Sequence, residues 1–103
     1  MEFIETPVFT RMDDDLLDED GQRGLQNVLI ADPLCGDLIS GGGGIRKLRH
    51  AVSGRGKSGG VRVIYYVKLA NDQIHMLVIY PKSKKDNLTD AETALLRDFV
   101  KEL

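Results

Sequence analysis

The chain has 103 residues, of which 42% are hydrophobic and 29% charged, a composition typical of a globular protein rather than a disordered one. This length supports one hydrophobic core, so we expect a single domain over residues 1–103. The single cysteine excludes an internal disulfide and a cysteine-based metal site, and we expect no metal and no cofactor. No apolar run approaches the roughly 20 residues of a membrane helix, and the N-terminus does not resemble a signal peptide. We therefore expect a cytoplasmic protein without membrane contact.

The net charge of -2 conceals a strong segregation of charge along the chain. Residues 1–45 carry a net charge of -8, residues 46–85 a net charge of +9, and residues 86–103 a net charge of -3. In the middle segment, ten of the eleven charged side chains are basic. Oppositely charged segments of one domain can neutralise each other, but like charges gathered in one region cost stability unless a ligand uses them. The pattern favours a surface for an anionic ligand.

Two helices are predicted after a short N-terminal strand that runs from Glu2 to Thr6. Pro7 suits the first position of a helix that continues toward Leu17, because proline lacks only an amide hydrogen that would be unpaired there. Asp18 can cap a second helix, which Asp32-Pro33 ends because proline cannot continue the hydrogen-bond ladder. Three apolar residues recur at helical spacing in this second helix: Leu25, Val28 and Leu29.

Six acidic residues gather where the two helices would join: Asp13, Asp14, Asp15, Asp18, Glu19 and Asp20. No turn glycine and distal glutamate complete a calcium-binding loop around them. Carboxylates near the start of a helix also interact favourably with its dipole. We therefore expect a solvated turn here rather than a metal site.

The second half of the chain is predicted to form a sheet, because the hydrophobic period changes after the break at Gly41–Gly44. Strands are expected over Ile45–Val52, Val61–Leu69 and Ile74–Tyr80, with a short turn at residues 70–72 between the last two. In the middle strand, alternation places one set of side chains on the core face: Val61, Val63, Tyr65, Val67 and Leu69. The opposite face then carries Arg62, Ile64, Tyr66 and Lys68.

A final helix is predicted from a capping box over Thr89-Asp90-Ala91-Glu92, in which threonine and glutamate satisfy each other's backbone amides. One apolar stripe follows, suited to packing on the sheet or to being held by a partner chain: Leu95, Leu96, Phe99, Val100 and Leu103. The full order is strand, helix, helix, three strands, helix. This order predicts an α+β fold, with an N-terminal strand and two helices followed by a mainly antiparallel sheet and a C-terminal helix.

The segment Ala51-Val52-Ser53-Gly54-Arg55-Gly56-Lys57-Ser58 partly matches a phosphate-loop pattern, but its context does not fit. A phosphate loop opens a helix, whereas the residues that follow here predict a strand. We expect a long hairpin loop instead, from which Arg55 and Lys57 can reach a phosphate backbone.

Basic side chains converge when the predicted strands are paired. Arg46, Lys47 and Arg49 lie on the first sheet strand and Arg62 on the second. An antiparallel hairpin places Arg62 beside the loop that follows the third strand, which carries Lys82, Lys84 and Lys85. Guanidinium groups clamp phosphate oxygens in pairs, and lysines act as point charges or proton donors. The residues therefore predict a phosphate-binding cleft.

Three segments in this order resemble the core of the RelE/HigB messenger-RNA interferases, in the HigB-like branch. They are Gly43-Gly44-Ile45-Arg46-Lys47-Leu48-Arg49, Gly59-Gly60-Val61-Arg62-Val63-Ile64-Tyr65-Tyr66 and Leu77-Val78-Ile79-Tyr80-Pro81-Lys82-Ser83-Lys84-Lys85. The resemblance implies a RelE-like fold and the toxin of a type II toxin–antitoxin system. It also implies a ribosome-dependent endoribonuclease that cleaves messenger RNA without a metal, by attack of the ribose 2′-hydroxyl on the neighbouring phosphate, and so inhibits translation.

Carried over position by position, the resemblance implies a set of catalytic residues: Arg62, Lys82, Lys84, Arg49 and Arg46. Residues expected to bind RNA are Lys47, Arg55, Lys57, Tyr66 and Lys85. Members of the family carry a tyrosine or histidine near the C-terminal end that assists proton transfer, and this chain has neither after Lys85. Lys82, Lys84, Tyr66 and His50 therefore remain candidates for that role. Because Arg46 and Arg49 are three residues apart, a regular strand points them to opposite faces, and one of them is structural unless a bulge intervenes.

Two other functions remain open at this point: a non-catalytic module that binds RNA or DNA, and a degenerate toxin that acts only through protein partners. The first predicts salt-sensitive binding without strand scission. The partners implied by the resemblance are messenger RNA on the ribosome and a cognate antitoxin with a helix-turn-helix. Operator DNA is expected to be bound only through the complex with that antitoxin.

Overall fold

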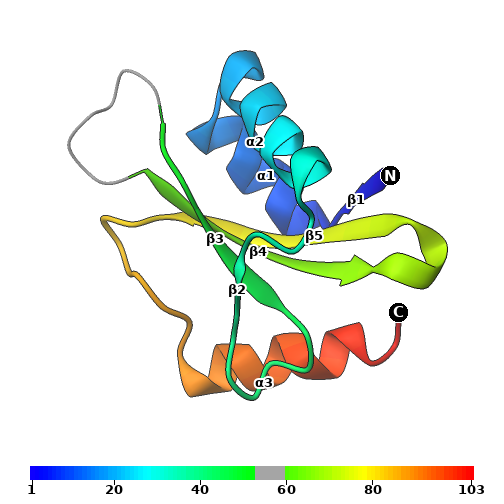
Figure 1. Ribbon diagram of the computed structural model, residues 1–103. Helices are drawn as coiled ribbons and strands as arrows, with labels where there is room; N and C mark the ends of the chain where they lie inside the picture. Colours follow the sequence, from blue (N-terminus) through cyan, green and yellow to red (C-terminus); the bar gives the residue numbers. More distant parts are fainter. Residues whose placement is uncertain (53–59) are drawn as a thin grey trace.

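The computed structural model describes residues 1–52 and 60–103, which form one five-stranded mixed sheet with helices on both faces (Figure 1). The elements follow the chain as β1 (Glu2–Glu5), α1 (Pro7–Leu16), α2 (Glu19–Ala31), β2 (Asp37–Leu38), β3 (Arg46–His50), β4 (Val61–Lys68), a 3₁₀ turn (Leu69–Asn71), β5 (Gln73–Pro81) and α3 (Asp90–Val100). The predicted α+β order is confirmed. The hairpin loop expected to carry Arg55 and Lys57 lies outside the described residues.

The strand order across the sheet is β1-β5-β4-β3-β2. β1 pairs with β5 in parallel, and the other neighbours are antiparallel. The short edge strand β2 was not predicted, because two residues are too few to show an alternating pattern. β3 is also shorter than expected: it spans residues 46–50, whereas the prediction covered 45–52.

Both helices of the first half begin as the sequence predicts. The Thr6 hydroxyl accepts a hydrogen bond from the Phe9 amide at 3.0 Å, and Pro7 follows as the first helical residue of α1. The Asp18 carboxylate accepts a hydrogen bond from the Gly21 amide at 2.8 Å and caps α2. The predicted capping box at Thr89 is also present at the start of α3.

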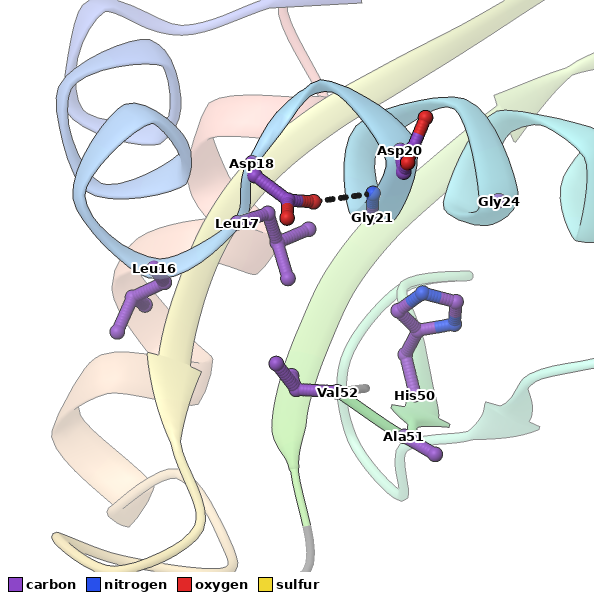
Figure 2. A pocket seen from close by; sticks show the side chains of 9 residues that line it. All are labelled: Leu16, Leu17, Asp18, Asp20, Gly21, Gly24, His50, Ala51 and Val52. Carbon is purple, nitrogen blue, oxygen red and sulfur yellow. Dashed lines mark hydrogen bonds between the residues drawn. The ribbon is translucent and has the colours of Figure 1, made fainter. Parts of the chain in front are cut away.

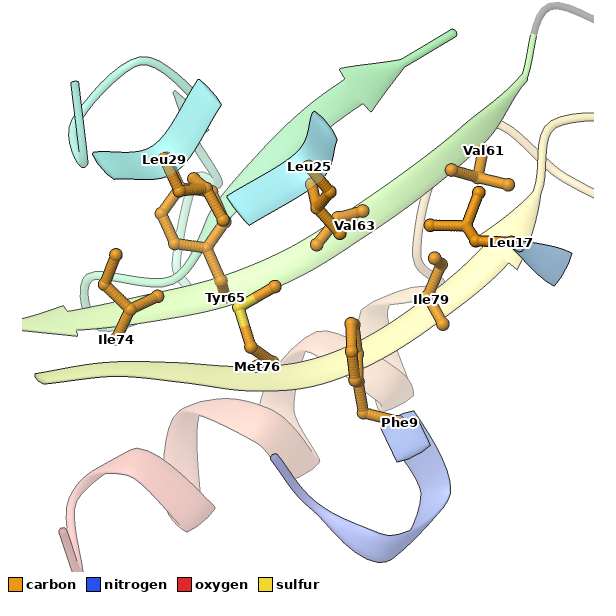
Figure 3. Close-up of a cluster of buried hydrophobic side chains, with 10 residues drawn as sticks. All are labelled: Phe9, Leu17, Leu25, Leu29, Val61, Val63, Tyr65, Ile74, Met76 and Ile79. Atoms are coloured by element: carbon orange, nitrogen blue, oxygen red, sulfur yellow. The ribbon is translucent and has the colours of Figure 1, made fainter. Parts of the chain in front are cut away.

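The first hydrophobic core lies between the sheet and the helices α1 and α2 (Figure 3). It consists of Phe9, Leu17, Leu25, Leu29, Val61, Val63, Tyr65, Ile74, Met76 and Ile79. The predicted inward face of the middle strand is confirmed from Val61 to Tyr65. Leu69 is a correction: 66% of it is exposed, because the strand ends at Lys68 and Leu69 lies in the 3₁₀ turn.

The opposite face of β4 carries a second core, under α3, made of Ile45, Ile64, Leu77, Tyr80 and Val100. A register shift between β4 and β5 leaves Leu77 unpaired, with Ile64 opposite Val78 and Tyr65 opposite Met76. Of the expected apolar stripe of α3, Leu96, Val100 and Leu103 pack on the sheet, whereas Leu95 is 71% exposed and Phe99 is also exposed. Both faces of the sheet are therefore covered.

The Tyr65 hydroxyl connects β4 to the loop before β2. It accepts a hydrogen bond from the Gly36 amide at 2.8 Å and donates one to the Pro33 carbonyl, also at 2.8 Å. Burial raises the pKa of Tyr65 to about 12, so the hydroxyl stays protonated and keeps both bonds.

Replacing Tyr65 by phenylalanine leaves a buried amide and a carbonyl without their partner. We expect the free energy of unfolding to fall by about 1–3 kcal/mol, measured by urea denaturation monitored by circular dichroism. The half-buried neighbour Tyr66 is the matched control, and its change to phenylalanine is expected to cost less than about 1 kcal/mol. Equal losses for the two variants would contradict the assignment of the Tyr65 bonds.

Candidate functional site: a basic cluster and the loop that covers it

Three basic side chains lie on the α3 face of the sheet, where alternation along the strands places them together. Lys47 and Arg49 come from β3, and Arg62 comes from β4 directly opposite Arg49 in the register. We call these three residues the basic cluster. β3 and β4 pair without a register shift over residues 46–50 and 61–65, so the positions of the three side chains follow from the strand period of two.

The loop that follows β5 lies beside this cluster, as the antiparallel hairpin predicts. Val61 is opposite Pro81 in the register, and the Lys82 amide donates a hydrogen bond to the Gly60 carbonyl at 3.1 Å. We call residues 82–89 the lysine loop, since it contains Lys82, Lys84 and Lys85. The structure therefore brings Arg62 and this loop together.

Arg62 is almost completely buried, and it forms an ion pair with an acid that the sequence analysis did not single out. Only 5% of the Arg62 side chain is exposed, and its Nε donates to Asp86 Oδ1 at 2.7 Å. The pKa of Asp86 is lowered, first by this hydrogen bond and further by the positive charges of Arg62, Lys47 and Arg49. A buried guanidinium is costly unless it is paired, so Asp86 offsets the cost of placing Arg62 under the loop.

The other two members of the basic cluster also have polar partners: Lys47 forms hydrogen bonds to the lysine loop, and Arg49 forms an ion pair with β2. The Lys47 ammonium donates to the Asp86 carbonyl at 3.3 Å and to the side-chain oxygen of Asn87. One guanidinium nitrogen of Arg49, Nη1, lies 3.8 Å from Oδ2 of Asp37 on the edge strand β2. A hollow of about 260 Å³, lined by Lys47, Asn87 and Asp37 among others, adjoins the cluster. Lys47 and Arg62 thus tie the lysine loop to the sheet through Asp86.

The three lysines of the loop differ in their surroundings. Lys82 and Lys84 are exposed. Lys85 forms an ion pair with Glu92 at 2.5 Å, and its ammonium lies 5.0 Å from the centre of the Tyr80 ring. Burial, followed by the charges of Asp86 and Glu92, raises the pKa of Tyr80. Lys82 and Lys84 are therefore the lysines of the loop that an anionic ligand can reach directly.

Arg46 lies on the opposite face of the sheet from the basic cluster. It is paired with Tyr65 in the register, and one of its guanidinium nitrogens donates to the carbonyls of Leu34 at 3.1 Å and Gly36 at 2.8 Å. These bonds hold the loop before β2 against the side of the sheet that α2 covers. Of the two arginines on β3, Arg49 belongs to the cluster and Arg46 supports the fold.

The other predicted residues are placed as follows. Tyr66 is half-buried and packs against the second core, with its ring centre 6.5 Å from that of His75. His50 points away from the cluster, into a hollow of about 480 Å³ between the start of α2 and the end of β3 (Figure 2). Burial lowers the pKa of His50. Arg55 and Lys57 lie outside the described residues.

The acidic junction of α1 and α2 departs from its prediction at one position. Asp13 is only 6% exposed and lines a small hollow with Phe9, Leu25 and Met76, whereas the sequence indicated a solvated turn. Burial, followed by the negative charges of Glu5 and Asp14, raises its pKa from 3.8 to about 6. Within residues 1–52 and 60–103, Asp13 Oδ1 has no hydrogen-bond partner.

No helix within residues 1–52 and 60–103 is long and apolar enough to cross a membrane. Nor does that part of the chain bring together three or more histidine, cysteine or carboxylate side chains in an arrangement that could hold a metal ion.

Asp86 is the residue of this site that sequence reasoning missed. It begins the acidic C-terminal segment and was counted there, although it directly follows the lysines of the loop. An acid adjacent in sequence to a predicted phosphate-binding loop is the signal that could have identified it.

The fold and the cluster define a small α+β protein with a basic site between the sheet and the loop after β5. The family model of the RelE toxin of the RelE/RelB toxin–antitoxin system matches residues 34–103, which include the whole basic cluster and the lysine loop. The chain belongs to this family. Membership implies the toxin of a toxin–antitoxin pair and a cognate antitoxin as its partner.

Proposed function

We propose that the chain is a ribosome-dependent endoribonuclease of the HigB-like branch, which cleaves messenger RNA and arrests translation in the cytoplasm. The observation that carries this proposal is the convergence of Lys47, Arg49 and Arg62 beside a loop with exposed lysines, within the segment that the family model matches. The proposed reaction needs positive charge around one phosphate, and this site concentrates it.

In the proposed reaction the ribose 2′-oxygen attacks the adjacent phosphorus and passes its proton to a water molecule. The bond from phosphorus to the 5′-oxygen breaks, and that oxygen gains a proton, which leaves a 2′,3′-cyclic phosphate and a 5′-hydroxyl. Arg62 and Arg49 are proposed to stabilise the charge on the phosphate oxygens, and Lys82 or Lys84 to protonate the leaving oxygen. Lys47, Tyr66 and Lys85, with Arg55 and Lys57, are proposed to hold the flanking RNA.

Arg46 has no part in this proposal, because it holds the loop at Leu34 and Gly36 on the other face of the sheet. We also propose that residues 1–103 act as one domain with the antitoxin as regulatory partner. Contact with operator DNA is proposed only through the complex with the antitoxin.

The test is growth arrest on induced expression, followed by mapping of messenger-RNA cleavage on purified ribosomes. We expect Lys82→Gln combined with Lys84→Gln to lower the cleavage rate by roughly 10²-fold or more, since two exposed charges are lost from the phosphate site. Arg62→Lys is expected to lower it by a similar factor, because lysine cannot reproduce the guanidinium geometry.

Lys101→Gln is the control, since Lys101 lies at the end of α3 and pairs with Asp98. It should cleave like the wild-type chain. Cleavage that survives in the double lysine variant, or a wild-type chain that neither arrests growth nor cuts RNA on ribosomes, would contradict the proposal.

A non-catalytic RNA-binding module remains the second candidate, and the Arg62–Asp86 ion pair favours it, since Asp86 occupies a guanidinium edge that the cleavage reaction would use. This candidate predicts RNA binding that weakens steeply with salt and no cut strands in the same ribosome assay.

A further inference from the structure

The Arg62–Asp86 pair places a carboxylate where the proposed reaction needs a phosphate. Carboxylate and phosphate oxygens are alternative partners for the same edge of a guanidinium. The Asp86 oxygen is 2.7 Å from Arg62 Nε, which is the length of a strong charge-assisted hydrogen bond. An anion cannot bind that edge while Asp86 holds it.

The two side chains of the Arg62–Asp86 pair differ in their exposure to solvent. The Arg62 side chain is 5% exposed and the Asp86 side chain 44% exposed, so the acid is the member of the pair that solvent reaches. Asp86 also lies in the lysine loop, between the end of β5 and the start of α3, where it has no strand or helix pairing. Its carbonyl is held by the Lys47 ammonium at 3.3 Å and by the Tyr80 hydroxyl at a longer 3.4 Å.

The positive charge around Asp86 would attract an RNA phosphate as well as the carboxylate. The positive charges of Lys47, Arg49 and Arg62 all contribute to lowering the pKa of Asp86. The carboxylate is therefore attracted by three cations at once. Asp86 removes part of the repulsion among them in the absence of a ligand. A phosphate group of RNA carries the same charge and would relieve the same repulsion.

We propose that Asp86 acts as an internal substitute for the RNA phosphate, and that RNA must displace it from Arg62 to form the productive complex. The structure then corresponds to a closed form of the site. This inference rests on the proposed function, because it assumes that Arg62 binds a phosphate during the reaction.

The test compares binding of a single-stranded RNA oligonucleotide, made uncleavable by 2′-O-methylation, to the full chain and its variants by fluorescence anisotropy. Asp86→Asn keeps an oxygen that can accept from Arg62 Nε but loses the charge that competes with phosphate. We expect this variant to bind RNA about tenfold more tightly than the wild-type chain, the gain that one charge-assisted hydrogen bond supplies.

Asp90→Asn is the matched control, because it removes one exposed negative charge from the first turn of α3 and so corrects for the change in net charge. Its affinity is expected to change by less than about twofold. In a chain that also carries Arg62→Gln, the gain from Asp86→Asn should fall to the level of this control. A gain that does not exceed the control, or one that persists without Arg62, would overturn the inference.

A measurement on the wild-type chain covers the case in which Asp86→Asn does not fold. Nuclear magnetic resonance signals of the Arg62 Nε–H group and the Asp86 carboxyl carbon should both shift as the oligonucleotide is added. RNA binding with an unchanged Asp86 signal would contradict displacement and leave the proposed ribonuclease intact. Absence of RNA binding by the wild-type chain and by every variant would overturn the inference, whereas the proposed function is tested separately by cleavage on purified ribosomes.

Discussion

Replacing Gly60 by alanine is expected to destabilise the fold by about 3 kcal/mol or more, through backbone strain and overpacking together. Gly60 has a φ of 76°, in the left-handed region, and an added Cβ atom would lie 2.2 Å from the His50 carbonyl oxygen. That oxygen belongs to the backbone of the neighbouring strand, so it cannot move away as a flexible side chain could. Urea denaturation and thermal unfolding measure the loss.

Gly41 is the matched control for this effect, because its φ is 72° and nothing lies within 4 Å of the position of an added Cβ. Gly41→Ala should therefore cost only the left-handed backbone, about 1–2 kcal/mol. The difference between the two variants isolates the clash. Similar losses at both positions would show that β3 shifts to accommodate the Gly60 side chain.

Replacing Asp13 by asparagine is expected to stabilise the chain at pH 7 by up to about 3 kcal/mol and to have little effect at pH 4. The pKa of Asp13 is raised from 3.8 to about 6 in the folded chain, so the folded state binds its proton more tightly than the unfolded state. Stability from this group is therefore present below about pH 4 and is lost as pH rises toward 6. Asparagine removes the charge that burial penalises.

The groups that face Asp13 from the surrounding elements are Glu5 at the end of β1, Asp14 on α1 and Gln22 on α2. Unfolding free energies of the wild-type chain, Asp13→Asn and the exposed control Asp15→Asn should be compared between pH 4 and pH 7.5. The wild-type curve should fall toward the upper end, and the Asp13→Asn curve should be flatter. Parallel curves for all three chains would contradict the effect of burial on Asp13.

Most of the fold is predictable from local patterns because those patterns express constraints within a few residues. The caps at Asp18 and Thr89 and the proline at the start of α1 form hydrogen bonds or avoid clashes locally. The edge strand β2 and the exposure of Leu69 depend instead on where the chain leaves the sheet. From the sequence, packing of the last helix on the sheet is only one of two alternatives, since alternation in β4 places Arg62 and Tyr66 opposite the first core without showing that α3 packs there.

The candidate site shows the same division. The proximity of Arg62 to the lysine loop follows from an antiparallel hairpin, and the separation of Arg46 from Arg49 follows from a strand period of two. The Asp86 contact follows from neither, because it depends on how residues 82–89 turn back over the sheet. Local sequence reports which charges are present, and the loop conformation determines which charges are paired.

The parallel pairing of β1 with β5 fixes the order in which the molecule can assemble during synthesis. The Thr6 hydroxyl donates to the Leu77 carbonyl at 2.7 Å across 71 positions of sequence, and β5 occupies the place between β1 and β4. This interior strand, β5, is thus made after more than two thirds of the chain. Contacts of such long sequence separation form slowly. A chain interrupted before residue 73 also lacks Ile74, Met76 and Ile79 of the first core and the whole lysine loop. The lysine loop can therefore join the basic cluster only in a chain synthesised nearly to its end.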